Sequence, residues 1–180
     1  MLETGVASFY TYHNAAHTQY VLEKSIFIAG KENIGQNELY LLKVAALYHD
    51  TGFTIDRIEH EAIGCDIVRD QLPGFGFSAP DIDKICGMIM ATRVPQKPKN
   101  LLEKVLADAD LEYLSTHGFF TTGELLFKEL QYFNPELGRK NWNHLQASFL
   151  TNHRYHTPYC RRYREFRKNK NLQVLLSRGT

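Results

Sequence analysis

The stretch QNELYLLKVAALYHD, residues 36–50, decides the expected fold. Its apolar stripe consists of Leu39, Leu42, Ala46 and Leu47. These residues recur at helical spacing, the stretch holds neither Gly nor Pro, and Gly52 follows as a stop signal. The stretch therefore predicts an amphipathic helix that ends in the polar pair His49-Asp50.

The same periodicity recurs along most of the chain, whereas alternating strand patterns are nearly absent. Seven further helices are predicted at 14–28, 59–72, 82–92, 101–115, 122–133, 136–154 and 159–176. Ser78 and Asn100 are suited to cap two of them, and Asn134 and Thr157 each precede a Pro that would open a helix. The prolines within 94–100 indicate a loop. We predict an all-α fold, a bundle of about eight helices in one domain over residues 1–180.

Composition narrows the class of protein. The chain has 180 residues, of which 43% are hydrophobic, and its 21 Lys+Arg against 20 Asp+Glu leave a net charge of +1. This length can bury a sizeable core, and the low net charge argues against disorder. A balanced charge gives no long-range attraction to nucleic acid, so that partner is not expected. The basic stretch 161–170 is interpreted as a solvated helix face.

No targeting signal is expected from the features of the sequence that indicate a cellular location. No apolar run reaches the roughly 18 residues of a membrane span. Residues 1–10 contain Glu3, no Lys or Arg and no apolar core, so they do not read as a signal peptide. Cys65, Cys86 and Cys160 lie far apart without CxxC spacing, which indicates buried free thiols. We expect a cytoplasmic protein without membrane contact.

Histidines and acids gather at places that suit a metal ion. His13 and His17 are four residues apart at the opening of the first predicted helix, so they would project from one face. His49 and Asp50 follow a largely apolar turn, which predicts a half-buried acid that a cation could neutralise. Imidazole nitrogen and carboxylate oxygen suit a borderline or hard divalent cation.

A third source of acid is the segment 106–111, LADADL. The apolar direction of this helix runs near Val105, Ala109 and Tyr113, and Asp110 falls closer to it than Asp108 does. That placement favours Asp110 as the inward ligand and leaves Asp108 as the alternative.

In their order, these motifs resemble the signature of the HD-domain superfamily of metal-dependent phosphohydrolases. The motifs are Tyr12-His13-Asn14-x-x-His17, His49-Asp50-Thr51-Gly52-Phe53 and Asp108-Ala109-Asp110. The resemblance implies that His17, His49, Asp50 and Asp110 hold a divalent ion, which could be Mn, Fe, Co, Ni, Zn or Mg. The first motif also looks like its counterpart in cyclic-nucleotide phosphodiesterases, and this likeness implies that His13 is the proton donor.

The implied reaction is hydrolysis of a phosphate ester of a nucleotide or another small molecule, with metal-activated water as the nucleophile. Asp50 or Asp110 could accept the proton of that water. Phosphomonoester and phosphodiester substrates both remain open. The alternative in another class is a catalytically idle HD fold that senses a nucleotide or a partner protein.

Other candidates surround these motifs. His60 could bind substrate or a second metal ion, or could simply pair with a carboxylate at a helix start. Basic residues in or beside loops could bind phosphate: Arg57, Arg93, Lys97 and Lys99. Trp142, Leu145 and Phe149 recur at helical spacing and are predicted to be core, and His153 is assigned a structural role.

Overall fold

The computed structural model describes residues 7–178, and it forms helices without any strand in that range. The α-helices are α2 (Ala15–Lys31), α3 (Gln36–Tyr48), α4 (His60–Gln71), α5 (Ala79–Met90), α6 (Leu101–Asp110), α7 (Phe119–Phe133), α8 (Arg139–Asn152), α9 (Pro158–Tyr163) and α10 (Glu165–Ser177). Three short 3₁₀ helices are η1 (Thr51–Thr54), η2 (Leu72–Phe75) and η3 (Glu112–Ser115). The predicted all-α class is confirmed, with nine α-helices between residues 7 and 178 where about eight were expected.

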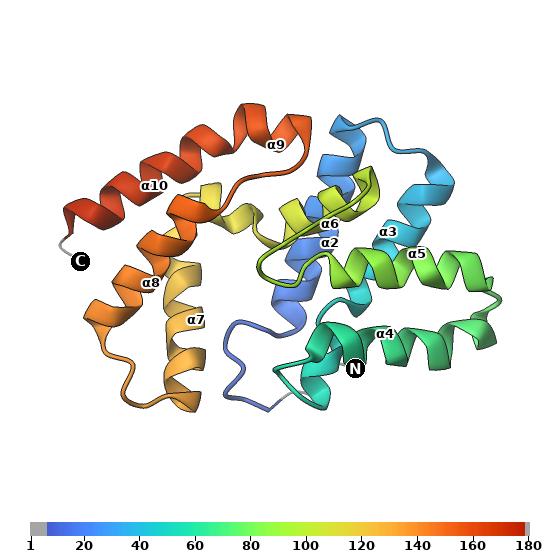
Figure 1. Cartoon of the computed structure of the whole chain (residues 1–180), viewed down its shortest axis with the longest axis horizontal. Helices are drawn as coiled ribbons and strands as arrows, with labels where there is room; N and C mark the ends of the chain where they lie inside the picture. Colours follow the sequence, from blue (N-terminus) through green and yellow to red (C-terminus); the bar gives the residue numbers. More distant parts are fainter. Residues whose placement is uncertain (1–6, 179–180) are drawn as a thin grey trace.

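The helices divide into two groups, and the candidate ligands lie where the groups meet. Figure 1 shows α7, α8 and α10 on one side, α3, α4 and α5 on the other, and α2 and α6 between them. The largest apolar core joins α2, α3, α4, α5 and α6. A second core cluster is formed by Tyr12, Leu111, Tyr113, Leu114, Phe119 and Leu150, which connects the middle of the molecule to α7 and α8.

Three of the predicted helix caps are confirmed. The side chain of Ser78 accepts a hydrogen bond from the amide of Asp81 at the start of α5. The side chain of Asn100 does the same for Glu103 in α6, and that of Thr157 for Cys160 in α9. Each cap satisfies a backbone donor that the first turn of a helix would otherwise leave unpaired.

Several predicted boundaries are wrong. Asn134 and Pro135 do not open α8, because the following turn buries Leu137 against Phe127 and Trp142 and the helix begins only after Gly138. The predicted helix 101–115 ends at Asp110. The contacts of Leu137 account for the first difference, and in the second the chain continues as the 3₁₀ helix η3.

The C-terminal segment 159–176 is also not one continuous helix. It divides at Arg164, whose guanidinium lies 2.7 Å from the buried carboxylate of Glu112. The interpretation of this basic segment as a purely solvated face is wrong for Lys168, which is fully buried and donates to the carbonyl of His153.

The expected location rests on the apolar segments and the cysteines of the chain. Within residues 7–178, none of the helices combines the length and the apolar character needed to cross a membrane. Cys65, Cys86 and Cys160 are free and buried, as expected. Most of the segment 1–10 and the last two residues lie outside the described residues. The cytoplasmic location and the domain extent of 1–180 stay predictions.

Candidate metal centre

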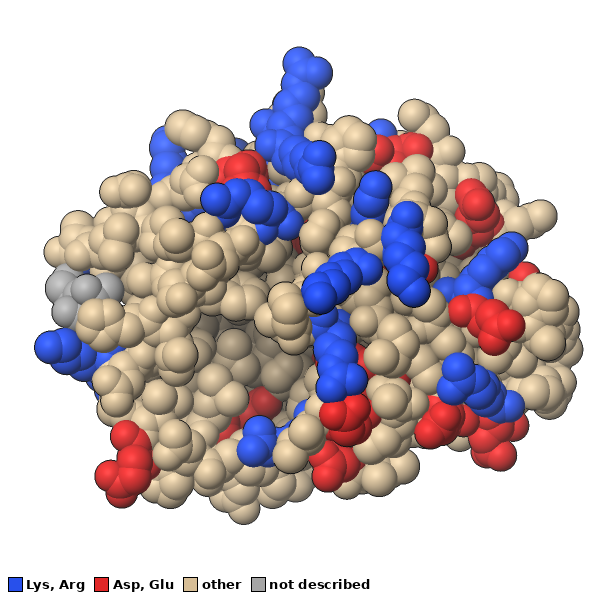
Figure 2. All heavy atoms as spheres, viewed as in Figure 1, with Lys and Arg blue, Asp and Glu red and all other residues tan. Residues whose placement is uncertain are grey.

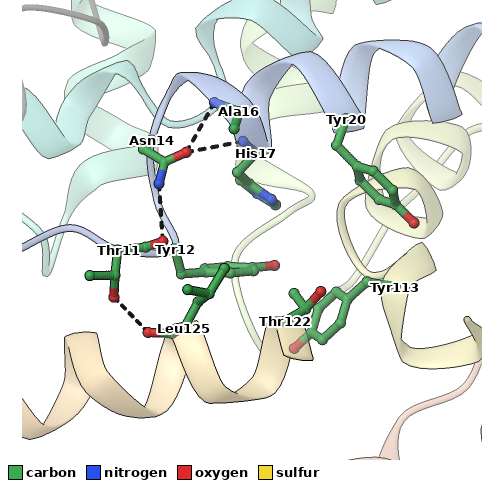
Figure 3. Close-up of a pocket in the computed structure, with 9 residues that line it drawn as sticks. All are labelled: Thr11, Tyr12, Asn14, Ala16, His17, Tyr20, Tyr113, Thr122 and Leu125. Atoms are coloured by element: carbon green, nitrogen blue, oxygen red, sulfur yellow. Dashed lines mark hydrogen bonds between the residues drawn. The ribbon is translucent and has the colours of Figure 1, made fainter. Parts of the chain in front are cut away.

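Asn14 fixes the start of α2 and thereby the place of His17. Its Oδ1 accepts from the backbone amides of Ala16 at 3.0 Å and His17 at 3.3 Å, and its Nδ2 donates to the Thr11 carbonyl at 3.0 Å (Figure 3). The Thr11 hydroxyl donates to the Leu125 carbonyl at 2.7 Å. Asn14 is therefore the N-cap of α2, and the loop before it is tied to α7.

Four side chains from three parts of the chain converge at one point. His17 Nε2 lies 3.1 Å from Asp110 Oδ1 and 3.4 Å from both His49 Nε2 and Asp50 Oδ2. His49 Nε2 lies 3.2 Å from Asp50 Oδ2. Ligand atoms about 2.1 Å from a shared ion lie roughly 3 to 3.5 Å apart. The ligand atoms of His17, His49 and Asp110 all lie within 4.8 Å of one another, which is compatible with a metal site.

The hydrogen bonds around these ligands also suit a cation. His49 Nδ1 lies 2.9 Å from the Ala46 carbonyl. Because a carbonyl only accepts, Nδ1 carries the proton of the neutral imidazole, and Nε2 is the nitrogen whose lone pair can face a cation in the cluster. Asp50 Oδ2 is buried and has no hydrogen-bond partner, although two imidazoles lie close by. An unpartnered buried carboxylate oxygen between lone pairs is the feature that a bound divalent ion would satisfy.

The electrostatics point in the same direction. Burial lowers the pKa of His49, but the charge and proximity of Asp50 outweigh it and raise the pKa to about 9. Burial would raise the pKa of Asp50, yet the positive charge of His49 holds that pKa well below its usual range. The carboxylates therefore favour positive charge at this point, whether from protons or from a metal ion.

His13 lies beside the cluster, but not where the sequence placed it. It precedes the cap Asn14 and so does not share a helix face with His17. Its ring stacks on Phe53 with centroids 4.3 Å apart. The predicted i, i+4 geometry is wrong because α2 begins only at Ala15.

Glu129 of α7 holds His13 in place, and the sequence analysis missed it. Its Oε2 accepts from the backbone amides of Tyr12 at 2.8 Å and His13 at 3.0 Å, and its Oε1 pairs with His13 Nδ1. Burial lowers the pKa of His13, but the Glu129 hydrogen bond and the nearby carboxylates raise it above its ordinary value overall. The available signal was an acid four residues from both Leu125 and Phe133 on an apolar helix face.

Comparison with known proteins decides the fold. No protein-family model matches the sequence, and no curated protein matches it. A crystal structure from an uncultured Thermotogales bacterium, described as a predicted HD superfamily hydrolase, is similar with a TM-score of 0.60. The match covers 93% of this chain and 82% of that chain, at 20% identity. This chain has the HD-domain fold. The fold resemblance drawn from the motifs is confirmed.

Asp110, and not Asp108, faces the cluster of His17, His49 and Asp50. Asp108 is fully buried and accepts from the backbone amides of His156 and Thr157, both at 2.8 Å, and from the Thr157 hydroxyl at 2.7 Å. It therefore anchors the start of α9. Both oxygens of Asp108 are thus used in these hydrogen bonds, and Asp110 as the ligand stays a prediction.

His60 reaches the centre from the start of α4. Its Nδ1 lies 2.9 Å from the Arg57 carbonyl, so its Nε2 keeps a lone pair. That Nε2 lies 3.3 Å from Glu61 Oε1 and 3.8 Å from Asp50 Oδ1. Glu61 is buried, and its Oε2 has no hydrogen-bond partner. His60 and Glu61 thus form a second group of possible ligands that adjoins the first through Asp50.

A cavity of about 580 Å³ opens from this centre. His13, Asp50, His60, Glu61 and Asp110 line its polar end. Side chains of α7 and α8 form one wall, and the segments 58–61, 92–94 and 111–114 also contribute to the lining. Figure 2 shows the surface hollowed beside the α7–α8 side of the HD domain, with walls that are mostly neither acidic nor basic. The expectation that Leu145 is core is wrong, because it is 54% exposed and lines this cavity.

The basic residues predicted to bind phosphate are placed unevenly. Arg93 lines the cavity, but its guanidinium forms two hydrogen bonds to Glu59, at 2.8 and 3.0 Å. The guanidinium of Arg57 lies 4.4 Å from the centre of the Phe133 ring. Lys97 and Lys99 are not among the residues that line the cavity. The structure does not bring these four side chains together.

Proposed function

We propose that this HD domain is a metal-dependent hydrolase of phosphate esters. The observation that carries the proposal is the convergence of two imidazole nitrogens with two carboxylate oxygens, one of which is the unpartnered Asp50 Oδ2. In this proposal, His17, His49, Asp50 and Asp110 hold the ion. A mixed set of this kind accepts Mn, Fe, Co, Ni, Zn or Mg.

When bound, the ion would lower the pKa of a water molecule and polarise the phosphorus–oxygen bonds. The carboxylate of Asp50 or Asp110 accepts the proton of the attacking water. His13, held by Glu129 at the same end of the cavity, donates a proton to the oxygen that leaves phosphorus. Water adds its oxygen to phosphorus and the ester bond to the alcohol oxygen breaks. The products are an alcohol and phosphate from a monoester, or an alcohol and a phosphate monoester from a diester.

His60 and Glu61 extend the proposal. Together with Asp50, which also belongs to the first group, His60 and Glu61 would hold a second ion. His60 therefore belongs to the metal and substrate end of the cavity. A metal content of nearly two ions per chain in the wild type and of one in His60→Ala would support this arrangement.

The test of the proposed function compares the wild-type protein with Asp50→Ala. Metal content is measured by elemental analysis, and turnover is measured on an activated aryl phosphate monoester and on a phosphodiester. Asp66→Ala is the control, because Asp66 is an exposed acid on α4. We expect metal and turnover in the wild type and the control, and neither in Asp50→Ala.

Two other outcomes would contradict the proposal. Metal without turnover on either ester class would favour the catalytically idle sensor. A protein that takes up none of the six candidate ions would refute the ligand assignment itself. The two ester classes also separate a monoesterase from a diesterase.

A further inference from the structure

The cavity has two chemically different ends. One end is formed by His13, Asp50, His60, Glu61 and Asp110, and Arg93 is the other charged residue of the lining. Away from them the wall is aliphatic and aromatic, with Leu126 and Leu130 from α7 and Trp142, Leu145 and Phe149 from α8. On those two helices, Gln146 is the polar side chain among the described residues that line the wall. A ligand that fills this volume must therefore bury an apolar body once its phosphate is at the metal centre.

The rim of the cavity is apolar as well. Leu145, Val94 and Ile58 come from three separate segments, line the same cavity, and are 54%, 55% and 66% exposed. Aliphatic side chains that gather around one opening and remain in water indicate a surface that a ligand covers. These three residues can close over the part of a ligand that extends out of the cavity.

The charge of the lining is equally selective. Of the lining residues within 7–178, Arg93 is the single Lys or Arg, and Glu59 already binds it through both guanidinium nitrogens. A second phosphate, as in a nucleoside diphosphate or triphosphate, finds no free cation along the wall. A ribose has several hydroxyls to satisfy, and Gln146 is the polar side chain that the α7–α8 wall offers them.

We propose that the substrate is a phosphate monoester of a large, uncharged and mainly apolar alcohol, and that α7 and α8 select it. This inference rests on the proposed phosphate-ester hydrolysis. Water adds to phosphorus, the bond from phosphorus to the alkyl oxygen breaks, and that oxygen takes the proton of His13. The products are the apolar alcohol and inorganic phosphate. The nucleotide substrate expected from the sequence then becomes the competing outcome.

Binding can be measured without turnover, because Trp142 is the single tryptophan of the chain and lines the cavity. Metal-loaded His13→Asn protein, which lacks the proposed proton donor and so does not consume the ligand, is titrated with octyl phosphate below its micelle concentration and with ribose 5-phosphate. Neither ligand absorbs near the tryptophan band. We expect octyl phosphate to change the Trp142 emission and to bind at least about tenfold more tightly than ribose 5-phosphate does.

Leu145→Gln is the test variant, because Leu145 is exposed and its replacement leaves the core intact. It should weaken octyl phosphate binding about tenfold and leave ribose 5-phosphate unchanged. Leu176→Gln is the matched control, since Leu176 is 46% exposed and is not part of the cavity lining. It should change neither affinity. With His13 in place, kcat/KM should likewise be higher for octyl phosphate than for ribose 5-phosphate, and Leu145→Gln should lower it for octyl phosphate.

Equal affinity for the two ligands, or an octyl phosphate affinity that Leu145→Gln leaves unchanged, would overturn the inference. Tighter binding of a ribonucleoside 5′-monophosphate than of octyl phosphate, measured by calorimetry, would overturn it in favour of a nucleotide. These results are separate from those on the proposed function. If the proposed function is wrong, the protein binds no metal or turns over none of the esters, including the activated aryl ester.

Discussion

Replacing His153 by Phe should make the protein less sensitive to acid. His153 is 9% exposed, and neither ring nitrogen has a hydrogen-bond partner. Its ring stacks on Phe149, with centroids 5.9 Å apart, and meets the Tyr155 ring edge-on at 4.8 Å. Burial, followed by the positive charge of Lys168 and other nearby cations, lowers the pKa of His153 to about 3.

The sign and size of the effect follow from this lowered pKa. Below pH 6.5, the ordinary value, the unfolded chain takes up a proton at His153 that the folded protein refuses until about pH 3. The free energy of unfolding therefore falls as the pH drops through this window. At pH 5 the solution is 1.5 pH units below the pKa of His153 in the unfolded chain. At about 1.4 kcal/mol per unit, the free energy of unfolding is therefore lower by about 2 kcal/mol.

Urea unfolding of the wild type and of His153→Phe at pH 7 and pH 5 measures this difference. Titration of the carboxylates and of the metal ligands is common to both proteins and cancels. We expect the wild type to lose about 2 kcal/mol more than the variant between the two pH values. His144→Gln, at an exposed histidine of α8, should follow the wild type. Parallel losses in the wild type and His153→Phe would refute the reasoning.

Two further substitutions test the packing around the centre. Asp108→Ala removes the acceptor of three hydrogen bonds at the start of α9, two of them from Thr157, and should lower the free energy of unfolding by about 3 kcal/mol in urea titrations. An unchanged midpoint would contradict the anchoring role. In Gly52→Ala, the new Cβ would lie 2.0 Å from the backbone oxygen of His60, so we expect a loss of about 3 kcal/mol and reduced metal content. Gly30→Ala, in open space on α2, should instead stabilise the protein by about 1 kcal/mol; equal effects of the two substitutions would refute the clash.

The sequence by itself determined the helical class, three of the caps and the identity of the metal-ligand candidates. Caps are local, because Ser78, Asn100 and Thr157 bond to amides three residues ahead. The stripe of residues 36–50 likewise depends only on helical periodicity. His49 and Asp50 could be recognised because a carboxylate after an apolar turn requires a partner.

Tertiary structure alone decided which of these groups meet. Glu129 lies 116 residues from His13, and no local pattern reports a hydrogen bond over that distance. Asp108 and Asp110 differ by two residues in one helix, yet one anchors α9 and the other faces His17. The same holds for Leu145, which periodicity assigns to the core although the packing of α7 and α8 leaves it on the wall of the cavity. Helical spacing fixes the direction of a side chain about its own axis, whereas the neighbour it meets depends on how separate helices pack.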